Sequence, residues 1–197
     1  MKEILFGAAY YLEYMPYDRL KEDLDMMQQA GMNTIRIAES TWSTLEPTDG
    51  EFDFSYIDRV LEEAQKRKMN VIIGTPTYAI PSWLEKKCPE VMVYNKEGRV
   101  RYGHRQIMDI MHPVFRKYAE RAICKLAEHT AAHPSVIGFQ IDNETKHYGT
   151  ASREVQELFK EHLKEKYHTT EALNKAFYLA YWSNSIHDWD DLPDMLG

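Results

Sequence analysis

The sequence predicts an α/β fold in which a parallel sheet carries helices on its outer side. Short apolar runs rich in β-branched residues alternate with stretches of helical periodicity, and polar or aromatic residues follow each apolar run. This alternation is typical of strands joined by right-handed helical crossovers, which place the strands in parallel. We therefore expect at least four parallel strands, near residues 5–11, 34–39, 70–76 and 135–142.

Helical periodicity fills the segments between and after these strands. Leu20, Leu24, Met27 and Ala30 recur at helical spacing, and Gly31 marks the end of that helix. The same periodicity predicts further helices at 57–64, 115–126, 155–163 and around 172–181. A short helix with proline in its first turn is expected at 81–87.

The fourth apolar run, 135–144, ends in the most informative polar cluster of the chain. A strand that is apolar along its whole length is expected to be buried on both faces. Its last residues, Asn143 and Glu144, would then lie at the rim where α/β barrels carry their chemistry. They could bind a hydroxyl and carry a proton; alternatively, they only cap the next helix.

Polar and aromatic residues also follow the first three strands. They are Tyr10, Tyr11 and Glu13, then Glu39, Ser40 and Trp42, then Thr75, Thr77 and Tyr78. The long connection 88–111 adds Arg99, Arg101, His104 and Arg105, and long connections are often functional. If the sheet is parallel, all these residues lie at one end of it, and we expect a binding cleft there.

Composition and charge limit the classes of protein to which this chain can belong. Hydrophobic residues make up 44% and charged residues 28% of the 197 residues, which is ordinary for a soluble globular domain. The net charge of −7 and the lack of a basic tract argue against a nucleic-acid partner. No segment approaches the length of a membrane span. Cys88 and Cys124 are far apart without metal-ligand spacing, so we expect reduced thiols and a cytoplasmic protein.

A series of short motifs runs along the chain in order. They are YYLE at 10–13, GMNTIR at 31–36, WSTLEP at 42–47, GEFDF at 50–54, GTPT at 74–77, PSWL at 81–84, YGHR at 102–105 and QIDNE at 140–144, with weaker likeness at 173–174 and 181–183. Together they resemble the N-terminal part of glycoside hydrolase family 42, a β-galactosidase family. The resemblance implies a TIM (β/α)8-barrel type fold, of which residues 1–197 hold the first half: about four to five parallel strands with outer helices.

The resemblance also implies roles for single residues. Glu144 matches the general acid/base of a retaining mechanism, and Asn143 matches the amide that binds the sugar 2-hydroxyl. Arg105 matches an arginine that contacts the galactosyl unit, and Trp182 resembles an aromatic residue lining the aglycone side. From the residue type alone, Arg105 would be an ordinary solvated charge.

Other rim residues have structural alternatives. Trp42 and Trp83 are expected to pack at the rim rather than to contact a ligand. Glu13 and Glu39 are either partners of Arg105 or simple surface charges. Some family members bind zinc through a cysteine cluster, but here the corresponding segments are MDIM at 108–111 and KHYG at 146–149. We therefore expect no metal and no cofactor.

The mechanism depends on a second carboxylate. Retaining glycosidases need two carboxyl groups about 5–5.5 Å apart. The family's nucleophile is on the seventh strand, which this chain does not reach, and Glu39 is a weak substitute. We expect a catalytic-domain fragment that binds a galactoside but is inactive without the missing C-terminal barrel half. The full-length enzyme could be a homo-oligomer.

A different class of function also fits. The chain could be a non-catalytic carbohydrate-binding or interaction module built on a half-barrel. The sequence ends at Gly197 without a capping helix or a polar tail, whereas a stand-alone domain would be expected to end in a packed or solvating element. This favours the fragment over the module.

Overall fold

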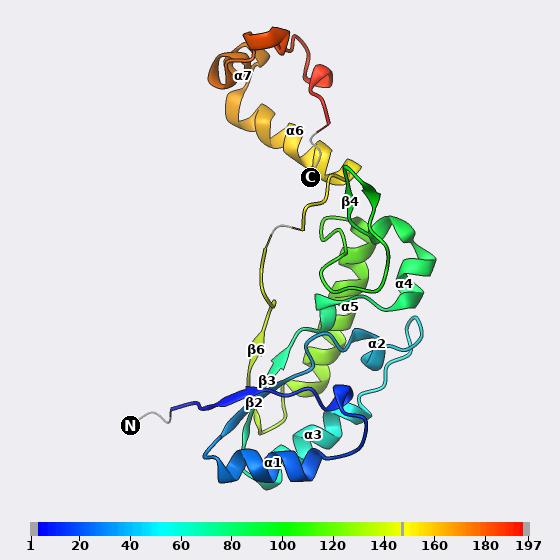
Figure 1. The fold of residues 1–197 in the computed structure, drawn as a ribbon, viewed down its shortest axis with the longest axis vertical. Coiled ribbons are helices and arrows are strands. Elements are labelled where there is room, and N and C mark those ends of the chain that lie inside the picture. The colour runs from blue at the N-terminus through cyan, green and yellow to red at the C-terminus, as the bar shows by residue number, and fades with distance from the viewer. Residues whose placement is uncertain (1–3, 147, 195–197) are drawn as a thin grey trace.

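The computed structural model describes residues 4–146 and 148–194. Its main sheet consists of β1 (Gly7–Ala9), β2 (Thr34–Ile37), β3 (Asn70–Gly74) and β6 (Val136–Gln140), in the order β1-β2-β3-β6 (Figure 1). All three pairings are parallel, so each strand lies beside the next one in this series. Each strand falls inside the range expected for it, and the predicted parallel sheet is confirmed.

Three longer helices connect these strands. They are α1 (Leu20–Gln29), α3 (Ser55–Lys66) and α5 (Pro113–Thr130). The apolar side chains that recur on α1 and α3, among them Leu24 and Leu61, pack with strand residues such as Ile35 and Ile73 in one buried cluster. Amphipathic periodicity thus turns one face of each helix toward the sheet.

A second buried cluster supports the rim. It is formed by α2 (Trp42–Leu45), α4 (Ser82–Lys87), α5 and the connection 88–111. Trp42 is fully buried and meets Trp83 edge-on at a centroid distance of 6.5 Å. The Trp83 indole nitrogen donates to the Glu46 carbonyl at 2.8 Å. The expectation that both tryptophans are packing residues is confirmed.

The connection after β3 carries a small hairpin of its own. Its strands, β4 (Tyr94–Asn95) and β5 (Gly98–Arg99), pair antiparallel and stand apart from the main sheet. Val93 accepts from Val100 and donates to Ile107 through its backbone, at 2.9 and 2.8 Å. These bonds fold the long connection back over itself, so that its last residues return to the sheet's C-terminal end.

The last described segment forms a separate small cluster. Helices α6 (Arg153–Tyr167) and α7 (Thr170–Phe177) pack through Leu163, Leu173 and Ile186. Figure 1 shows this segment extending away from the main sheet. The helix expected around 172–181 ends at Phe177, because Tyr178 adopts a left-handed conformation with φ 55°.

One expectation for the fourth strand is wrong. Ile137 and Phe139 are 46% and 41% exposed, so β6 is not buried on both faces. The reason is that β6 is an edge strand, paired with β3 alone, and its Ile137–Phe139 face is uncovered by the described residues. The opposite edge strand, β1, is exposed as well.

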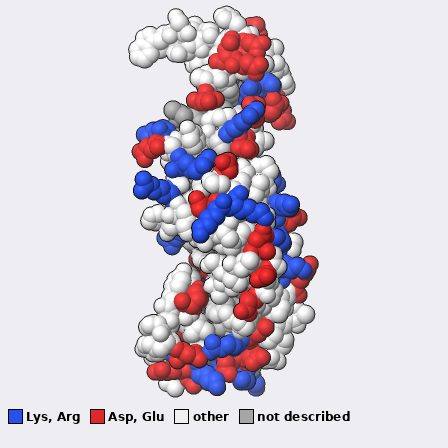
Figure 2. All heavy atoms as spheres, turned by 90° about the vertical axis from the view of Figure 1, so that its right-hand side faces the viewer, with Lys and Arg blue, Asp and Glu red and all other residues white. Residues whose placement is uncertain are grey.

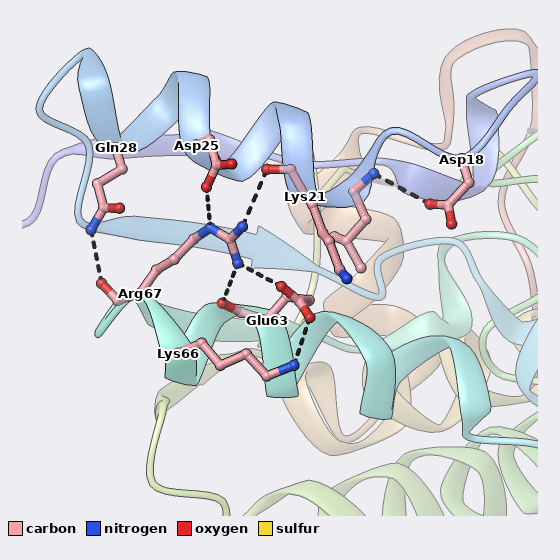
Figure 3. A network of polar contacts seen from close by, with 8 residues as sticks. Asp18, Lys21, Asp25, Gln28, Glu63, Lys66 and Arg67 are labelled. Carbon is pink, nitrogen blue, oxygen red and sulfur yellow. Dashed lines mark hydrogen bonds and ion pairs between the residues drawn. The ribbon is translucent and has the colours of Figure 1, made fainter.

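Charged side chains hold the outer helices together. Arg67, at the end of α3, donates to Asp25 of α1 at 2.7 Å, to Glu63 at 2.6 Å and to the Lys21 carbonyl at 3.4 Å (Figure 3). Lys66 donates to the same Glu63 at 2.7 Å. These two cations lower the pKa of Glu63 to about 2. Elsewhere Lys and Arg are interspersed with Asp and Glu on the face shown in Figure 2.

Candidate active site

The C-terminal end of the sheet brings together three of the residues that the sequence singles out. Arg105 Nη2 lies 3.4 Å from Glu144 Oε2, and Asn143 directly precedes Glu144 after the end of β6. Gln106, next to Arg105, donates to the Glu144 carbonyl at 3.0 Å and to the Asn143 carbonyl at 3.4 Å. The expected convergence of the YGHR and QIDNE segments at one rim is therefore confirmed.

The end of β6 is fastened to β3 by its backbone. Thr75 donates from its backbone nitrogen to the Gln140 carbonyl at 2.9 Å and from its hydroxyl to the Ile141 carbonyl at 2.6 Å. The Gln140 amide donates to Asn143 Oδ1 at 3.0 Å and to the Asp142 carbonyl at 2.8 Å. These bonds orient the Asn143 side chain and fix the path of the chain into Glu144.

Glu144 has an unusual backbone conformation for its residue type. Its φ of 47° lies in the left-handed region, which costs free energy for a residue with a side chain. The hydrogen bond from Gln106 to its carbonyl holds it there. Such local strain is found where surrounding structure dictates the position of one side chain.

The Glu144 carboxylate is held by two donors. The Tyr78 hydroxyl donates to Oε2, and Arg105 lies beside the same oxygen. The hydrogen bond from Tyr78, together with the charge of Arg105, lowers the pKa of Glu144 below its ordinary value. Both contacts favour the ionised form of the carboxyl over its protonated form.

Tyr78 is the residue of this site whose role sequence reasoning missed. It ends the short 3-10 helix Pro76–Tyr78 directly after β3, and its side chain is buried. Burial, and then the bond to Glu144, raise the pKa of its hydroxyl. The sequence signal was its place at the end of a predicted strand, but nothing in that position revealed the contact with Glu144.

A second polar group lies at the ends of β1 and β2. Glu39 is buried; Arg36 Nη2 lies 2.5 Å from its Oε2, and the Tyr11 hydroxyl donates to its Oε1 at 3.4 Å. Glu13 accepts from the Tyr56 hydroxyl at 2.8 Å, and burial raises the pKa of Glu13.

The surface-charge alternative is wrong for both glutamates. Glu39 is a buried partner of Arg36, and Glu13 is a half-buried partner of Tyr56, so neither is a simple surface charge. Neither forms an ion pair with Arg105 among the described residues. A paired and buried Glu39 is also poorly suited to be a free nucleophile.

Trp182 does not join this cluster. It lies in the short 3-10 helix Tyr181–Ser183, beyond α7, in the segment that Figure 1 shows away from the sheet. Its side chain is 82% exposed and stacks on Tyr181 at a centroid distance of 4.7 Å.

The described residues hold no group of three or more His, Cys, Asp or Glu side chains arranged to bind a metal. His147, in the KHYG segment, lies outside the described residues. Cys88 and Cys124 are free thiols. None of the helices within 4–146 and 148–194 is long and apolar enough to cross a bilayer.

Comparison with known proteins extends over nearly the whole chain. The family model of glycoside hydrolase family 42, described as beta-galactosidase, matches residues 9–194. A β-galactosidase from Thermus thermophilus is 37% identical over 192 residues, which cover 95% of this chain and 30% of that protein. BgaA from Thermus sp is 36% identical with the same coverage.

Solved structures agree with this match. The β-galactosidase from Rahnella sp. R3 superposes with a TM-score of 0.91 at 31% identity, covering 98% of this chain and 29% of that one. A catalytic mutant of Gan42B, a family-42 β-galactosidase from G. stearothermophilus, gives a TM-score of 0.90 at 32% identity, with 98% and 29% covered. The chain thus spans about 30% of the length of these relatives. It belongs to glycoside hydrolase family 42, the β-galactosidase family, and matches the first half of that family's TIM barrel.

Proposed function

We propose that residues 1–197 are the N-terminal portion of the catalytic barrel of a retaining β-galactosidase, and that Glu144 is its general acid/base. One observation carries this proposal: Arg105 and Glu144, from two separate motifs, lie 3.4 Å apart at the C-terminal end of a parallel sheet. In TIM barrels this end carries the chemistry.

Each rim residue has a part in this reaction. Glu144 donates a proton to the glycosidic oxygen as the bond to the aglycone breaks, and later accepts a proton from the attacking water. Asn143 binds the sugar 2-hydroxyl and Arg105 binds the galactosyl unit. Trp182 lines the aglycone side. This role is supported by the family resemblance and by the high exposure of Trp182, which leaves one aromatic face free for a sugar ring.

The nucleophile is the part that this chain lacks. Retention requires a second carboxylate about 5–5.5 Å from the first. Glu39 is buried against Arg36, so the second carboxylate comes from the remaining barrel half. That carboxylate would also raise the pKa of Glu144, because a neighbouring negative charge favours the protonated acid.

The same barrel half is also the partner that would cover the exposed edges of the sheet. Within the part of the chain that the structure describes, the edge strands β1 and β6 each pair with one strand only, and Ile137, Phe139 and Ile141 are exposed apolar side chains. Barrel closure would pair both edges and bury these side chains. We propose that the complete enzyme binds galactosides in the cytoplasm and uses no cofactor.

A two-part assay tests the proposal. The 197-residue chain alone should not hydrolyse a nitrophenyl galactoside. A chimera, in which this chain replaces the matching 30% of the Thermus thermophilus β-galactosidase, should hydrolyse it. Turnover by the isolated chain, free of host enzyme and lost on Glu39→Gln, would contradict the assignment of the nucleophile to the missing half. A folded chimera that binds galactose without any turnover would favour a carbohydrate-binding module.

A further inference from the structure

Tyr78 combines a buried ring with a hydroxyl that reaches the catalytic rim. Its side chain is 3% exposed, and it stands where β3 gives way to the connection leading to Arg105. The Tyr78 carbonyl accepts a hydrogen bond from the Gln106 backbone at 3.0 Å. The ring is therefore fixed by packing and by its own backbone, so its hydroxyl has a defined position.

That hydroxyl and Arg105 act on one atom. Tyr78 donates to Glu144 Oε2, and Arg105 Nη2 lies 3.4 Å from the same oxygen. The Arg105 guanidinium also lies over the Tyr78 ring, 5.3 Å from its centroid, at a distance where a cation is attracted to the ring face. Among the described residues, Glu144 Oε1 has no hydrogen-bond donor.

We propose that Tyr78 is a positioning residue for Glu144, which holds Oε2 and leaves Oε1 as the oxygen that exchanges the proton with the substrate. This inference rests on the proposed function, because it takes Glu144 to be the acid/base. In the acid form the proton is on Oε1. As the carboxylate of the remaining barrel half forms a bond to the anomeric carbon, transfer of this proton to the glycosidic oxygen releases the aglycone as an alcohol. Glu144 is left as a carboxylate, whose charge is stabilised at Oε2 by Tyr78 and Arg105.

The competing explanation is that Tyr78 only fills space. In that case the ring matters and the hydroxyl does not, because phenylalanine would pack equally well. The two explanations differ in what happens to the Glu144 carboxyl when the hydroxyl alone is removed. A donor to the ionised form of a carboxyl lowers its pKa, so loss of the donor must raise that pKa.

The test is a carboxyl ¹³C NMR titration of the 197-residue chain and of its Tyr78→Phe variant. We expect the pKa of Glu144 to shift upward in Tyr78→Phe. The matched control is Tyr102→Phe, because the Tyr102 hydroxyl donates to the Ile80 carbonyl at 3.1 Å and not to Glu144. This control should leave the pKa of Glu144 where it is. An unchanged pKa of Glu144 in Tyr78→Phe would overturn the proposal.

A reciprocal measurement guards against a misfolded Tyr78→Phe variant. Glu144→Gln changes an exposed side chain, and it removes the charge that helps to raise the pKa of Tyr78. The tyrosine ¹³Cζ signal of Tyr78 should therefore titrate at lower pH in Glu144→Gln. Titration at the same pH would overturn the proposal. Neither titration involves a galactoside, so its outcome is separate from that of the chimera assay.

Discussion

Arg105 and Glu144 lie 3.4 Å apart, although Arg105 is in the long connection after β3 and Glu144 comes after β6. The connection folds back through its hairpin, and Gln106 then bonds to the backbone of Asn143 and Glu144. The rim is thus held by backbone contacts as well as by the ion pair. Both side chains are more than half exposed, so the ion pair alone would hold them weakly.

The backbone contact can be tested through Gln106. We expect Gln106→Ala to broaden or shift the backbone NMR signals of Asn143 and Glu144, because the strained φ of Glu144 loses the donor to its carbonyl. Stability should fall by about 1 kcal/mol, the usual net value of one hydrogen bond. Unchanged signals at both residues would show that Gln106 does not hold this turn.

The contacts of Arg67 between α1 and α3 predict that two arginines differ in their contribution to stability. Arg67→Ala should lower the free energy of unfolding by about 2 kcal/mol, because Arg67 is largely buried and bonds to both helices. Arg59→Ala, which removes an exposed pair with Asp18, should cost about 0–1 kcal/mol. Urea unfolding measures both losses of stability, and equal losses would show that Arg67 does not hold α1 and α3 together.

The lowered pKa of Glu63 predicts that part of the chain's stability is lost at acidic pH. Its pKa is about 2 in the folded chain, against 4.5 without its partners. A depressed folded pKa contributes stability above pH 4.5 and loses it as the pH falls toward 2. The difference in unfolding free energy between the native chain and Glu63→Gln should therefore shrink from pH 7 to pH 3. A difference independent of pH would contradict this.

The burial of Glu46 predicts that its replacement costs more stability than replacement of Arg67. Its carboxylate is fully buried and accepts from the Trp42 indole at 2.9 Å, from the Gly50 nitrogen at 2.8 Å and from Arg121. Glu46→Ala should destabilise the chain by about 3–5 kcal/mol, because it leaves these donors without an acceptor. Asp49→Ala, at a more exposed partner of Arg121, should cost clearly less, and thermal unfolding compares the two.

Sequence reasoning succeeded where one local signal sufficed. Each apolar run marked its strand, and the rule that parallel strands end at one rim placed Arg105 near Glu144. It failed where the answer depended on contacts between distant segments or on the direction in which a side chain points. The exposure of Ile137 and Phe139 depends on what covers the sheet edge, and the pairing of Glu39 with Arg36 depends on side-chain direction. The role of Tyr78 depends on a carboxylate from another strand.

The most direct test of the account compares Glu144→Gln with the native residue in the chimera, on two substrates. For a galactoside with a poor leaving group, the variant should lose about 10²–10⁴-fold in kcat/KM, because the leaving oxygen needs a proton. For a nitrophenyl galactoside, which needs little protonation, the first release of nitrophenol should be spared. Equal rates of the variant and the native chimera on the poor leaving group would show that Glu144 is not the general acid.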